Sequence, residues 1–378
     1  QRKNPVSLYF WIKDLLSRPA LGLGSKLLLA PLAVAGWLYA QVQAARRWGY
    51  RRGLLPSSDP GVPVVSVGNV AVGGTGKTPC VEWVCRWFLD RGIRPAVLSR
   101  GYGGEAEGPV TVVSDGRGRV AGWREAGDEP VLLARRLPGV PVVVGPDRRL
   151  TARTAVELGA RVLVLDDGFQ HLRLRRHLDI VTVDVQNPFG NGWCLPRGLL
   201  REPPRALADA DVVLLTRTKG VPPDRIERAR ALVSRYAPEA PVLATSHEPA
   251  SWVPLGGGAP LPLEALRGKK VLAFAGIGKP EAFFRDLEAL GLRVVEAVPF
   301  PDHHPYTPDD KAQLARWAGL VNAEALVTTE KDGVRLEGPV PCDAPTVALA
   351  IELGVGDPGP LVAELERIAA AAGDPPGA

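Results

Sequence analysis

A glycine-rich run near residue 75 has the residue types and the spacing of a phosphate-binding loop. It consists of Gly73, Gly74, Thr75, Gly76, Lys77 and Thr78. The run follows a short apolar segment, Val62–Val67, and precedes an amphipathic one, so a strand leads into the loop and a helix follows it. Backbone N–H groups can then face phosphate oxygens, Lys77 can reach the β- and γ-phosphates of a nucleotide, and the Thr78 hydroxyl can bind Mg²⁺. The sequence therefore predicts a nucleotide phosphate site.

The loop alone leaves the acceptor of the phosphoryl group open, because ATPases, GTPases and kinases share it. A GTPase is expected to carry an Asn/Thr-Lys-x-Asp guanine reader after a strand. The nearest stretch, Thr216–Lys219, reads Thr-Arg-Thr-Lys and lacks the Asp. Guanine specificity therefore has no support in the sequence.

Two adjacent carboxylates, Asp166 and Asp167, follow an apolar strand candidate at Val162–Leu165. Neighbouring carboxylates repel one another unless a cation lies near them, which favours a Mg²⁺ role in which one acid holds the ion or its water. The alternative is that Asp166 caps the turn that follows.

Two further residues have side chains that can accept or donate a proton. Asp128 stands at the predicted start of a helix, where it can cap the helix or accept the proton of an attacking hydroxyl, and its segment favours neither alternative. His303 follows Asp302 in a loop of the C-terminal part, and a carboxylate beside a His can raise its basicity. A surface His pair, His303 and His304, is the simpler interpretation of that segment.

Alternating strands and helices must position these residues. Short Val/Leu/Ile runs are typical of strands that are buried on both faces of a parallel sheet. The order of the elements predicts an α/β fold, a P-loop NTPase-like doubly wound parallel sheet, with an inserted hairpin formed by Val110–Val113 and Arg119–Trp123. The strands are predicted at Val62–Val67, Ala96–Ser99, Pro141–Val144, Val162–Leu165, Ile180–Val183 and Val212–Thr216, and the helices at Thr78–Asp90, Glu129–Arg136, Arg148–Leu158 and Asp224–Tyr236.

A Pro- and Gly-rich stretch, Glu248–Pro262, predicts a domain boundary. We expect an N-terminal helical segment at 1–55, a P-loop core domain at 56–247 and a second, smaller α/β domain at 248–378. The strands of the second domain are predicted at Val271–Ala275, Arg293–Ala297, Ala325–Thr328 and Thr346–Leu349, and its helices at Glu281–Leu290, Pro308–Trp317 and Leu361–Ala371.

The composition limits which partners the protein is expected to bind and in which compartment it is expected to lie. The formal net charge is +5, a mild basicity that fits an anionic lipid or a phosphorylated substrate, and we expect no nucleic-acid partner. The four cysteines form no CxxC pair and no zinc-type spacing, so we expect reduced thiols in the cytosol. The chain begins at Gln1 and contains no methionine, so we expect that an N-terminal piece is absent. The sequence gives no indication of an oligomeric state.

The segment Leu27–Ala45 is almost entirely apolar, and Lys and Arg residues flank it. A membrane span needs about 20 such residues, so two forms of attachment stay open. One is a span with its C-terminal side in the cytosol, and the other is an interfacial helix with its aromatic residues at headgroup depth. A helix packed on the catalytic domain is the third alternative, and a cleaved signal peptide is disfavoured. We expect a membrane-associated helix.

Taken together, the motifs of this chain resemble one family, the tetraacyldisaccharide 4′-kinases, which are the lipid A 4′-kinases of Gram-negative bacteria. The resemblance covers nearly the whole chain and rests on the order and spacing of the motifs as a set. Ala71, where a strict phosphate-loop pattern has Gly, falls where this family varies. The motifs are the N-terminal apolar helix, Gly68-Asn69, Val72–Pro79, Ser99–Tyr102, Glu125–Pro130, Asp147-Arg148, Asp166–His171, Leu199–Pro203, Asp302-His303 and Thr328–Asp332.

The resemblance implies a kinase that uses ATP and Mg²⁺. Its acceptor would be the 4′-hydroxyl of a lipid-linked tetraacyldisaccharide 1-phosphate, and its product lipid IVA, made in lipid A (lipopolysaccharide) biosynthesis. It also implies a place at the inner membrane with the catalytic domains on the cytosolic side.

The resemblance assigns roles residue by residue. It implies Asp128 as the catalytic base with His303 as its partner, which decides between the two alternatives for Asp128. Lys77 and Thr78 take the nucleotide and metal roles and Asp166 and Asp167 those of the paired acids, while His304 matches no role. The candidate substrate contacts within the motifs are Arg100, Arg148, Gln170, His171, Arg201 and Glu202.

Two other functions compete with the kinase. The alternative enzyme is a membrane-associated P-loop ATPase that couples hydrolysis to a conformational step, and the third possibility is a nucleotide-binding regulatory module, which would need neither the paired acids nor the Asp128 and His303 constellation. Because His303 lies beyond the expected boundary and Asp128 before it, the two domains would have to close over ATP for that pair to form. We therefore expect a hinge at 246–268.

Overall fold

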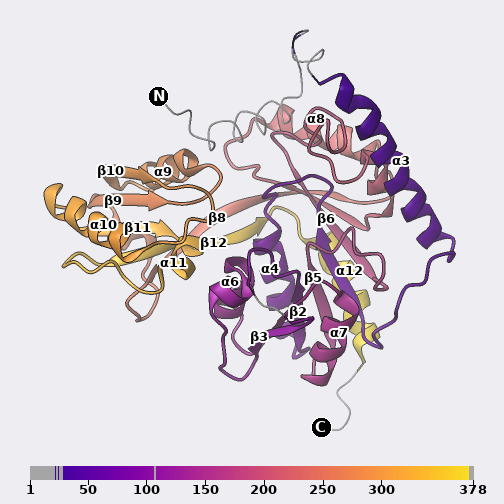
Figure 1. The fold of residues 1–378 in the computed structure, drawn as a ribbon, viewed down its shortest axis with the longest axis horizontal. Helices are drawn as coiled ribbons and strands as arrows, with labels where there is room; N and C mark the ends of the chain where they lie inside the picture. The colour runs from indigo at the N-terminus through magenta and orange to yellow at the C-terminus, as the bar shows by residue number, and fades with distance from the viewer. Residues whose placement is uncertain (1–21, 23, 25–28, 106–107, 374–378) are drawn as a thin grey trace.

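The computed structural model describes residues 22, 24, 29–105 and 108–373. A single sheet of 12 strands runs through these residues in the order β10-β9-β11-β12-β8-β7-β6-β1-β5-β2-β4-β3. Figure 1 shows the strands in two groups that are joined by β8 and β12. We call β1 to β7 with their helices the first unit, and β9 to β11 with theirs the second unit. The α/β architecture with a large, mostly parallel sheet is confirmed.

The first unit has a parallel centre and one antiparallel edge. Strands β1, β2, β4, β5, β6 and β7 pair in parallel, and β3 pairs antiparallel with β4. The strands are β1 (Val64–Gly68), β2 (Pro95–Ser99), β3 (Thr111–Asp115), β4 (Pro141–Val144), β5 (Val162–Asp166), β6 (Leu178–Asp184) and β7 (Val212–Thr216), and the helical elements are α4 (Lys77–Leu89), α5 (Trp123–Ala126), α6 (Asp128–Arg136), α7 (Arg148–Glu157), η1 (Pro204–Asp209) and α8 (Pro223–Ser234).

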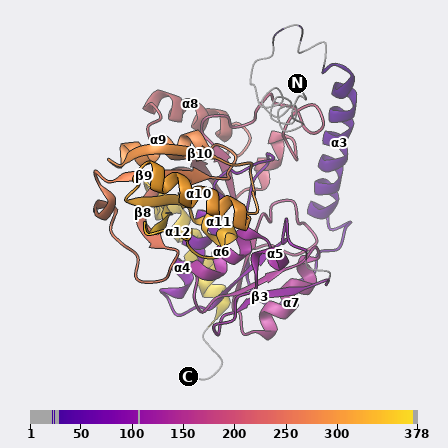
Figure 2. The same ribbon diagram turned by 60° about the vertical axis from the view of Figure 1, so that its left-hand side comes forward.

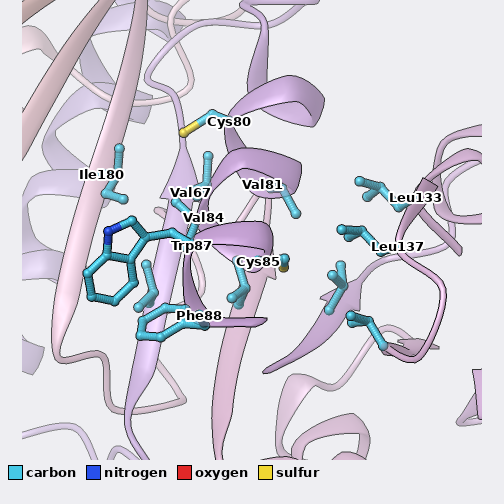
Figure 3. Close-up of a cluster of buried hydrophobic side chains, with 14 of the residues drawn as sticks. Val67, Cys80, Val81, Val84, Cys85, Trp87, Phe88, Leu133, Leu137 and Ile180 are labelled. Atoms are coloured by element: carbon cyan, nitrogen blue, oxygen red, sulfur yellow. The ribbon is translucent and has the colours of Figure 1, made fainter. Parts of the chain in front are cut away.

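Helices cover both faces of this sheet, which is why its strands are apolar without alternation. Within β1, Val65 and Val67 pack against α4 and α6, whereas Val64 lies in a separate cluster with α7. Figure 3 shows the first of these cores, in which side chains of α4 such as Phe88 lie between the strands and the residues Leu133 and Leu137 of α6 and its C-cap. The sheet thus holds the carboxyl end of β1 rigidly where the glycine-rich run begins.

The predicted hairpin at 110–123 is wrong in its second arm. β3 finds its partner in β4, at the edge of the sheet. Residues 119–123 form only an isolated bridge between Ser114 and Val120, and α5 begins at Trp123. The reason is that β4 offers β3 a longer ladder, while Gly116 and Gly118 both have positive φ values (71° and 112°) and bend the chain away.

The second unit is a three-stranded parallel sheet with helices on both faces. Phe283 and Leu287 of α9 cover one face of β9, and Leu314 of α10 covers the other. The elements are η2 (Leu263–Leu266), β9 (Lys270–Ala275), α9 (Pro280–Ala289), β10 (Arg293–Pro299), α10 (Pro308–Leu320), β11 (Ala325–Thr329) and α11 (Glu330–Leu336).

Two long strands connect the units. β8 (Val242–Pro254) pairs with β7 through its first three residues and with β12 (Thr346–Val355) from Thr245 onward. The expected boundary between residues 247 and 248 therefore falls inside a strand. After β12 the chain returns to the first unit, where Leu361, Leu365 and Ile368 of α12 (Gly359–Ala372) join the core of α4 and α6. Figure 1 shows α12, in yellow, beside the strands of the first unit.

The N-terminal helix α3 (Pro31–Arg51) lies along the outside of the first unit (Figure 2). Its inner face is anchored by Arg47, which is 5% exposed, and by Gly36, where any Cβ would come within 3.1 Å of the Cys194 carbonyl oxygen. Its outer face is apolar: Val34, Leu38 and Val42 are 66%, 52% and 64% exposed. No helix in the described part of the chain has the length and apolar character to cross a membrane.

Candidate functional site

The glycine-rich run leaves β1 at a point of close backbone contact. A Cβ on Gly68 would lie 2.5 Å from Cβ of Phe169, so only glycine fits there. The run then turns with positive φ at Gly73 (119°) and Gly76 (81°), a conformation that favours glycine. A Cβ on Gly76 would also meet Nε2 of His247 at 2.6 Å. The glycines thus meet a backbone requirement and a packing requirement at once.

Neighbouring strands fix the shape of the run. The buried Asn69 side chain donates to Thr75 Oγ1 at 2.8 Å, and Thr75 Oγ1 in turn contacts Thr182 Oγ1 of β6 at 2.7 Å. Thr216 of β7 donates to the Thr75 carbonyl oxygen at 2.9 Å, and Arg217 donates to that of Gly74 at 2.6 Å. These hydrogen bonds from Thr216 and Arg217 fix the carbonyl oxygens of Thr75 and Gly74, so the shape of the loop is set before a nucleotide binds.

Helix α4 begins within this run, at Lys77. Its N-cap, Gly76, supplies no side-chain hydrogen bond to the first turn, so the N–H groups of that turn suit an anion. The Lys77 ammonium lies 3.5 Å from Asp167 Oδ1. The backbone N–H groups at the start of α4 and the Lys77 ammonium therefore form, with the loop, one site that suits an anion.

The paired acids stand at the end of β5, next to β1 in the sheet: Asp166 is its last residue and Asp167 follows it. Asp166 is 3% exposed and accepts from Ser99 Oγ at 3.0 Å, while its Oδ1 has no hydrogen-bond partner in the described structure. Burial and the nearby Glu129 carboxylate raise the pKa of Asp166 to about 6, against the opposing charge of Lys77. Asp167 has φ 57° and contacts Arg201 Nη1 at 2.6 Å. Burial would raise the pKa of Asp167, but Lys77 and Arg201 outweigh it and lower that pKa.

These oxygens suit Mg²⁺. A buried carboxylate oxygen without a donor and the Thr78 hydroxyl at the start of α4 are hard oxygen ligands, which Mg²⁺ prefers. No group of three or more His, Cys, Asp or Glu side chains with metal-site geometry is present among the described residues. A partial set is what Mg²⁺ uses when phosphates and water complete its shell.

Asp128 is the first residue of α6, and the N-cap is Gly127, which has φ 90° and makes no side-chain cap bond. Asp128 Oδ1 accepts the backbone N–H of Glu129 at 2.9 Å, so one oxygen of its carboxylate serves the first turn of the helix. The Asp128 side chain is 6% exposed, its Oδ2 lies 2.9 Å from Nδ1 of His303, and it is 3.6 Å from Nη1 of Arg335. Burial would raise the pKa of Asp128, but His303, Arg335 and Lys331 outweigh it and lower that pKa. The carboxylate is thus ionised at neutral pH.

His303 comes from the second unit, in the loop after β10. It has φ 59°, and its N–H donates to the Gly276 carbonyl oxygen at 3.1 Å. The hydrogen bond to Asp128 raises the pKa of His303, against the effect of its partial burial. The predicted contact between Asp128 and His303 is confirmed, and in this structure the units already stand close enough to form it.

His304, the next residue in the chain, has a structural role. Its Nε2 lies 2.9 Å from Asp310 Oδ2, the carboxylate that completes the capping box of α10. Its ring stacks on Phe300 with the centroids 4.7 Å apart. His304 therefore packs within the second unit while His303 reaches the first.

The six candidate substrate contacts form two groups of side chains near Asp166 and Asp167. Arg148 is 3% exposed, donates to the Gly145 carbonyl oxygen at 2.6 Å, and its Nε has no partner in the described structure. Burial lowers the pKa of Arg148 to about 10, and the nearby Arg100 adds to this. Burial and the charge of Arg148 lower the pKa of His171 to about 4. Arg100 and Arg148 thus form a positive group near Asp166, and His171 beside them is neutral at neutral pH.

The other group is built around Glu202. Arg201 binds Asp167, whereas Glu202 is 1% exposed and receives Nη2 of Arg47 at 2.6 Å and Nε2 of Gln170 at 3.2 Å. The Gln170 amide also donates to the Asn69 carbonyl oxygen at 2.8 Å. Glu202 and Gln170 therefore tie the phosphate loop to helix α3.

Several residues of the site were not singled out by the sequence. Arg335 on α11 contacts Asp128 and donates to Asp332 Oδ1 at 2.5 Å. The motif Thr328–Asp332 contains Lys331 and Asp332, and a helical spacing of three residues from Asp332 would have pointed to Arg335. Thr182, which lies within β6, was not singled out at all, while Ser99 and Thr216 stood in stretches named above without any role of their own.

Comparisons with known proteins agree on one family. Residues 26–370 match the family described as Tetraacyldisaccharide-1-P 4'-kinase. A relative from Pelobacter propionicus named Tetraacyldisaccharide 4'-kinase is 44% identical over 364 residues, which cover 96% of this chain and 98% of the relative. A protein of the same name from Anaeromyxobacter dehalogenans is 50% identical over 309 residues, covering 82% and 81%.

A solved structure has the same fold. It is the crystal structure of LpxK from Aquifex aeolicus in complex with ATP, and it matches with a TM-score of 0.74 and 30% sequence identity. The match covers 90% of this chain and 99% of the other.

Proposed function

Since this chain belongs to the tetraacyldisaccharide-1-P 4'-kinase family, we propose that it transfers the γ-phosphate of ATP to the 4′-hydroxyl of a tetraacyldisaccharide 1-phosphate. The product is lipid IVA, in lipid A biosynthesis. The observation that carries the proposal is the Asp128 and His303 pair, which joins the two units. The relatives named for this kinase activity leave the ATPase alternative without support.

The residues around the loop supply positioning and charge, which is most of what phosphoryl transfer requires. The amides of the run and Lys77 bind the nucleotide phosphates. Asp128 accepts the proton of the 4′-hydroxyl as that oxygen attacks, and the His303 ring, bonded to Asp128 Oδ2 at 2.9 Å, orients the carboxylate and balances its charge.

Thr78, Asp166 and Asp167 are the residues that would hold Mg²⁺ here. Bound to them, the ion would neutralise charge on the phosphate oxygens. Ser99 keeps Asp166 oriented through its 3.0 Å hydrogen bond, and Arg201 does the same for Asp167 at 2.6 Å. The protein's own contribution is thus to fix the two carboxylates before the nucleotide arrives.

Helix α3 is the part of the chain that would meet the membrane. Its outer face carries Val34, Trp37, Leu38, Val42 and Trp48, all more than half exposed. A helix with one face packed on protein and an apolar, Trp-containing face outside fits an interfacial position at the inner membrane. The catalytic residues then lie on the cytosolic side, where ATP is, and the acceptor's acyl chains stay in the bilayer.

Transfer of labelled phosphate from ATP to a disaccharide-1-phosphate lipid tests the function. The wild type is expected to form a labelled lipid, and Lys77→Ala to lose at least about 10²-fold in turnover because a charge on the phosphates is removed. ATP consumption without lipid should be slow. Fast hydrolysis that lipid does not stimulate, with no labelled lipid, would support the ATPase instead.

Sedimentation with anionic phospholipid vesicles tests the membrane face. Replacing Val34, Leu38 and Val42 together by Ser is expected to weaken vesicle binding by about tenfold or more, since a fully buried apolar side chain contributes about 1.5–3 kcal/mol. Leu320→Ser is the matched control, because Leu320 is 79% exposed on α10 of the second unit. Equal binding by the triple variant and the wild type would contradict an interfacial α3.

A further inference from the structure

Lys331 is a cation that the second unit places at the reacting centre. It lies in the first turn of α11, directly after β11, and α11 packs against α6 of the first unit. Its ammonium pairs with the Glu129 carboxylate. Glu129 is the neighbour of Asp128, so the pair forms beside the residue that accepts the proton.

The surroundings of this ammonium are acidic. Burial disfavours its charged form, but the carboxylates of Glu129, Asp128 and Asp166 outweigh burial and raise the pKa of Lys331. Its side chain is still 34% exposed, so part of it faces solvent beside Glu129. Lys331 is therefore charged, held in place and only partly enclosed.

The transferred phosphorus must pass through the same space. Lys77 and the acids after β5 hold the nucleotide on one side, and Asp128 holds the attacking hydroxyl on the other. In the transfer, the bond from the γ-phosphorus to the β,γ-bridging oxygen breaks, and a bond from the 4′-oxygen to that phosphorus forms. The hydroxyl proton goes to Asp128 and ADP leaves. Around Asp128, the second unit contributes the positive charges of His303, Arg335 and Lys331, and Arg335 is only 2% exposed.

We propose that Lys331 is a further catalytic residue of this kinase, whose ammonium binds the γ-phosphate oxygens while the phosphoryl group moves. Glu129 holds the lysine in position, and α11 brings it with the second unit, so only the joined units have the full set of charges. The inference rests on the proposed function for the identity of the substrate.

A second ion pair between the same two helices provides the control. Arg136 Nη1 of α6 contacts Glu330 Oε2 of α11 at 2.8 Å. Burial raises the pKa of Glu330 to about 7, so a neutral glutamine is a mild replacement. Arg136 would keep Glu82 at 2.9 Å and the Ile351 carbonyl oxygen at 2.7 Å. Glu330→Gln thus weakens the contact between the units without touching the reacting centre.

Lys331→Met, Lys331→Arg and Glu330→Gln are to be compared with the wild type in the labelled-phosphate assay. Lys331→Met is expected to lower kcat, and kcat/KM for ATP by the same factor, about 10²–10³-fold, because an interaction made in the transition state is lost. Lys331→Arg keeps the charge and is expected to retain more activity than Lys331→Met. Glu330→Gln should have a kcat close to that of the wild type. ATP affinity by calorimetry should be unchanged in all three.

The results of this assay distinguish a failure of the Lys331 proposal from a failure of the proposed kinase function. Wild-type protein that labels no lipid would count against the proposed function. If the wild type labels lipid, the inference fails when Lys331→Met turns over like Glu330→Gln, when its defect lies only in KM or ATP affinity, or when Lys331→Arg is as slow as the Met variant.

Discussion

Replacing Asp128 by Asn is expected to lower kcat for phosphate transfer by about 10²–10⁴-fold, the usual contribution of a positioned general base. The amide keeps the shape of the carboxylate but cannot take up the proton of the attacking hydroxyl. Because the pKa of Asp128 lies below its ordinary value, the wild-type carboxylate is ready to accept a proton at neutral pH. ATP binding should remain, since Asp128 has no part in holding the nucleotide.

His303→Gln is the companion variant. The loss in His303→Gln should be no larger than that in Asp128→Asn, and the double variant should resemble Asp128→Asn alone, because residues that act as a unit are not additive. The measurement is steady-state transfer to the lipid together with calorimetric ATP binding. Turnover near wild type in Asp128→Asn, with ATP binding intact, would rule out Asp128 as the base.

Replacing Glu202 by Met is expected to lower the free energy of unfolding by about 1.5–3 kcal/mol, because the buried Arg47 loses its charge-assisted hydrogen bonds to Glu202 and keeps only Asp209, at 2.7 Å, as an ionic partner. Arg47 donates to Glu202 at 2.6 and 3.2 Å and to the Phe169 carbonyl oxygen at 3.1 Å, and its guanidinium lies 4.3 Å from the centre of the Phe169 ring. Denaturant unfolding followed by circular dichroism measures the change.

Arg51→Met is the matched control for this stability prediction. Arg51 lies on the same helix and pairs with Asp209, as Arg47 does, but its side chain is 48% exposed, so its loss should cost at most about 1 kcal/mol. Removing both buried charges, in Arg47→Met with Glu202→Met, should recover part of the stability. If Glu202→Met and Arg51→Met had the same free energy of unfolding, the buried pair of Arg47 and Glu202 would not be what holds α3 to the first unit.

The sequence predicts the first unit well because its information is local. Each parallel strand is a short apolar run that must be buried on both faces, and the glycines at 73 and 76 are required where φ is positive. The acids after β5 meet the loop because neighbouring parallel strands end at the same edge of a sheet. These features need no knowledge of distant contacts.

Features that depend on distant contacts were harder to predict. β8 contains Pro249 and the polar residues His247 and Glu248, so its sequence does not predict a strand there. Beyond the first three residues, which pair with β7, its ladder forms with β12, about a hundred residues later. The apolar stripe of α12 predicts a helix without saying which core it enters. Lys331 stands in a recognised motif, but only the packing of α11 on α6 reveals what it faces.

The return of the chain through β12 to α12 affects how the protein can be made. A ribosome delivers α12 after the entire second unit, yet Leu361, Leu365 and Ile368 complete the apolar core that supports the phosphate loop. Until α12 has been made, this core beside α4 and α6 is incomplete and prone to aggregation. A stop codon just before α12 would therefore damage the nucleotide site, although the missing residues follow the second unit.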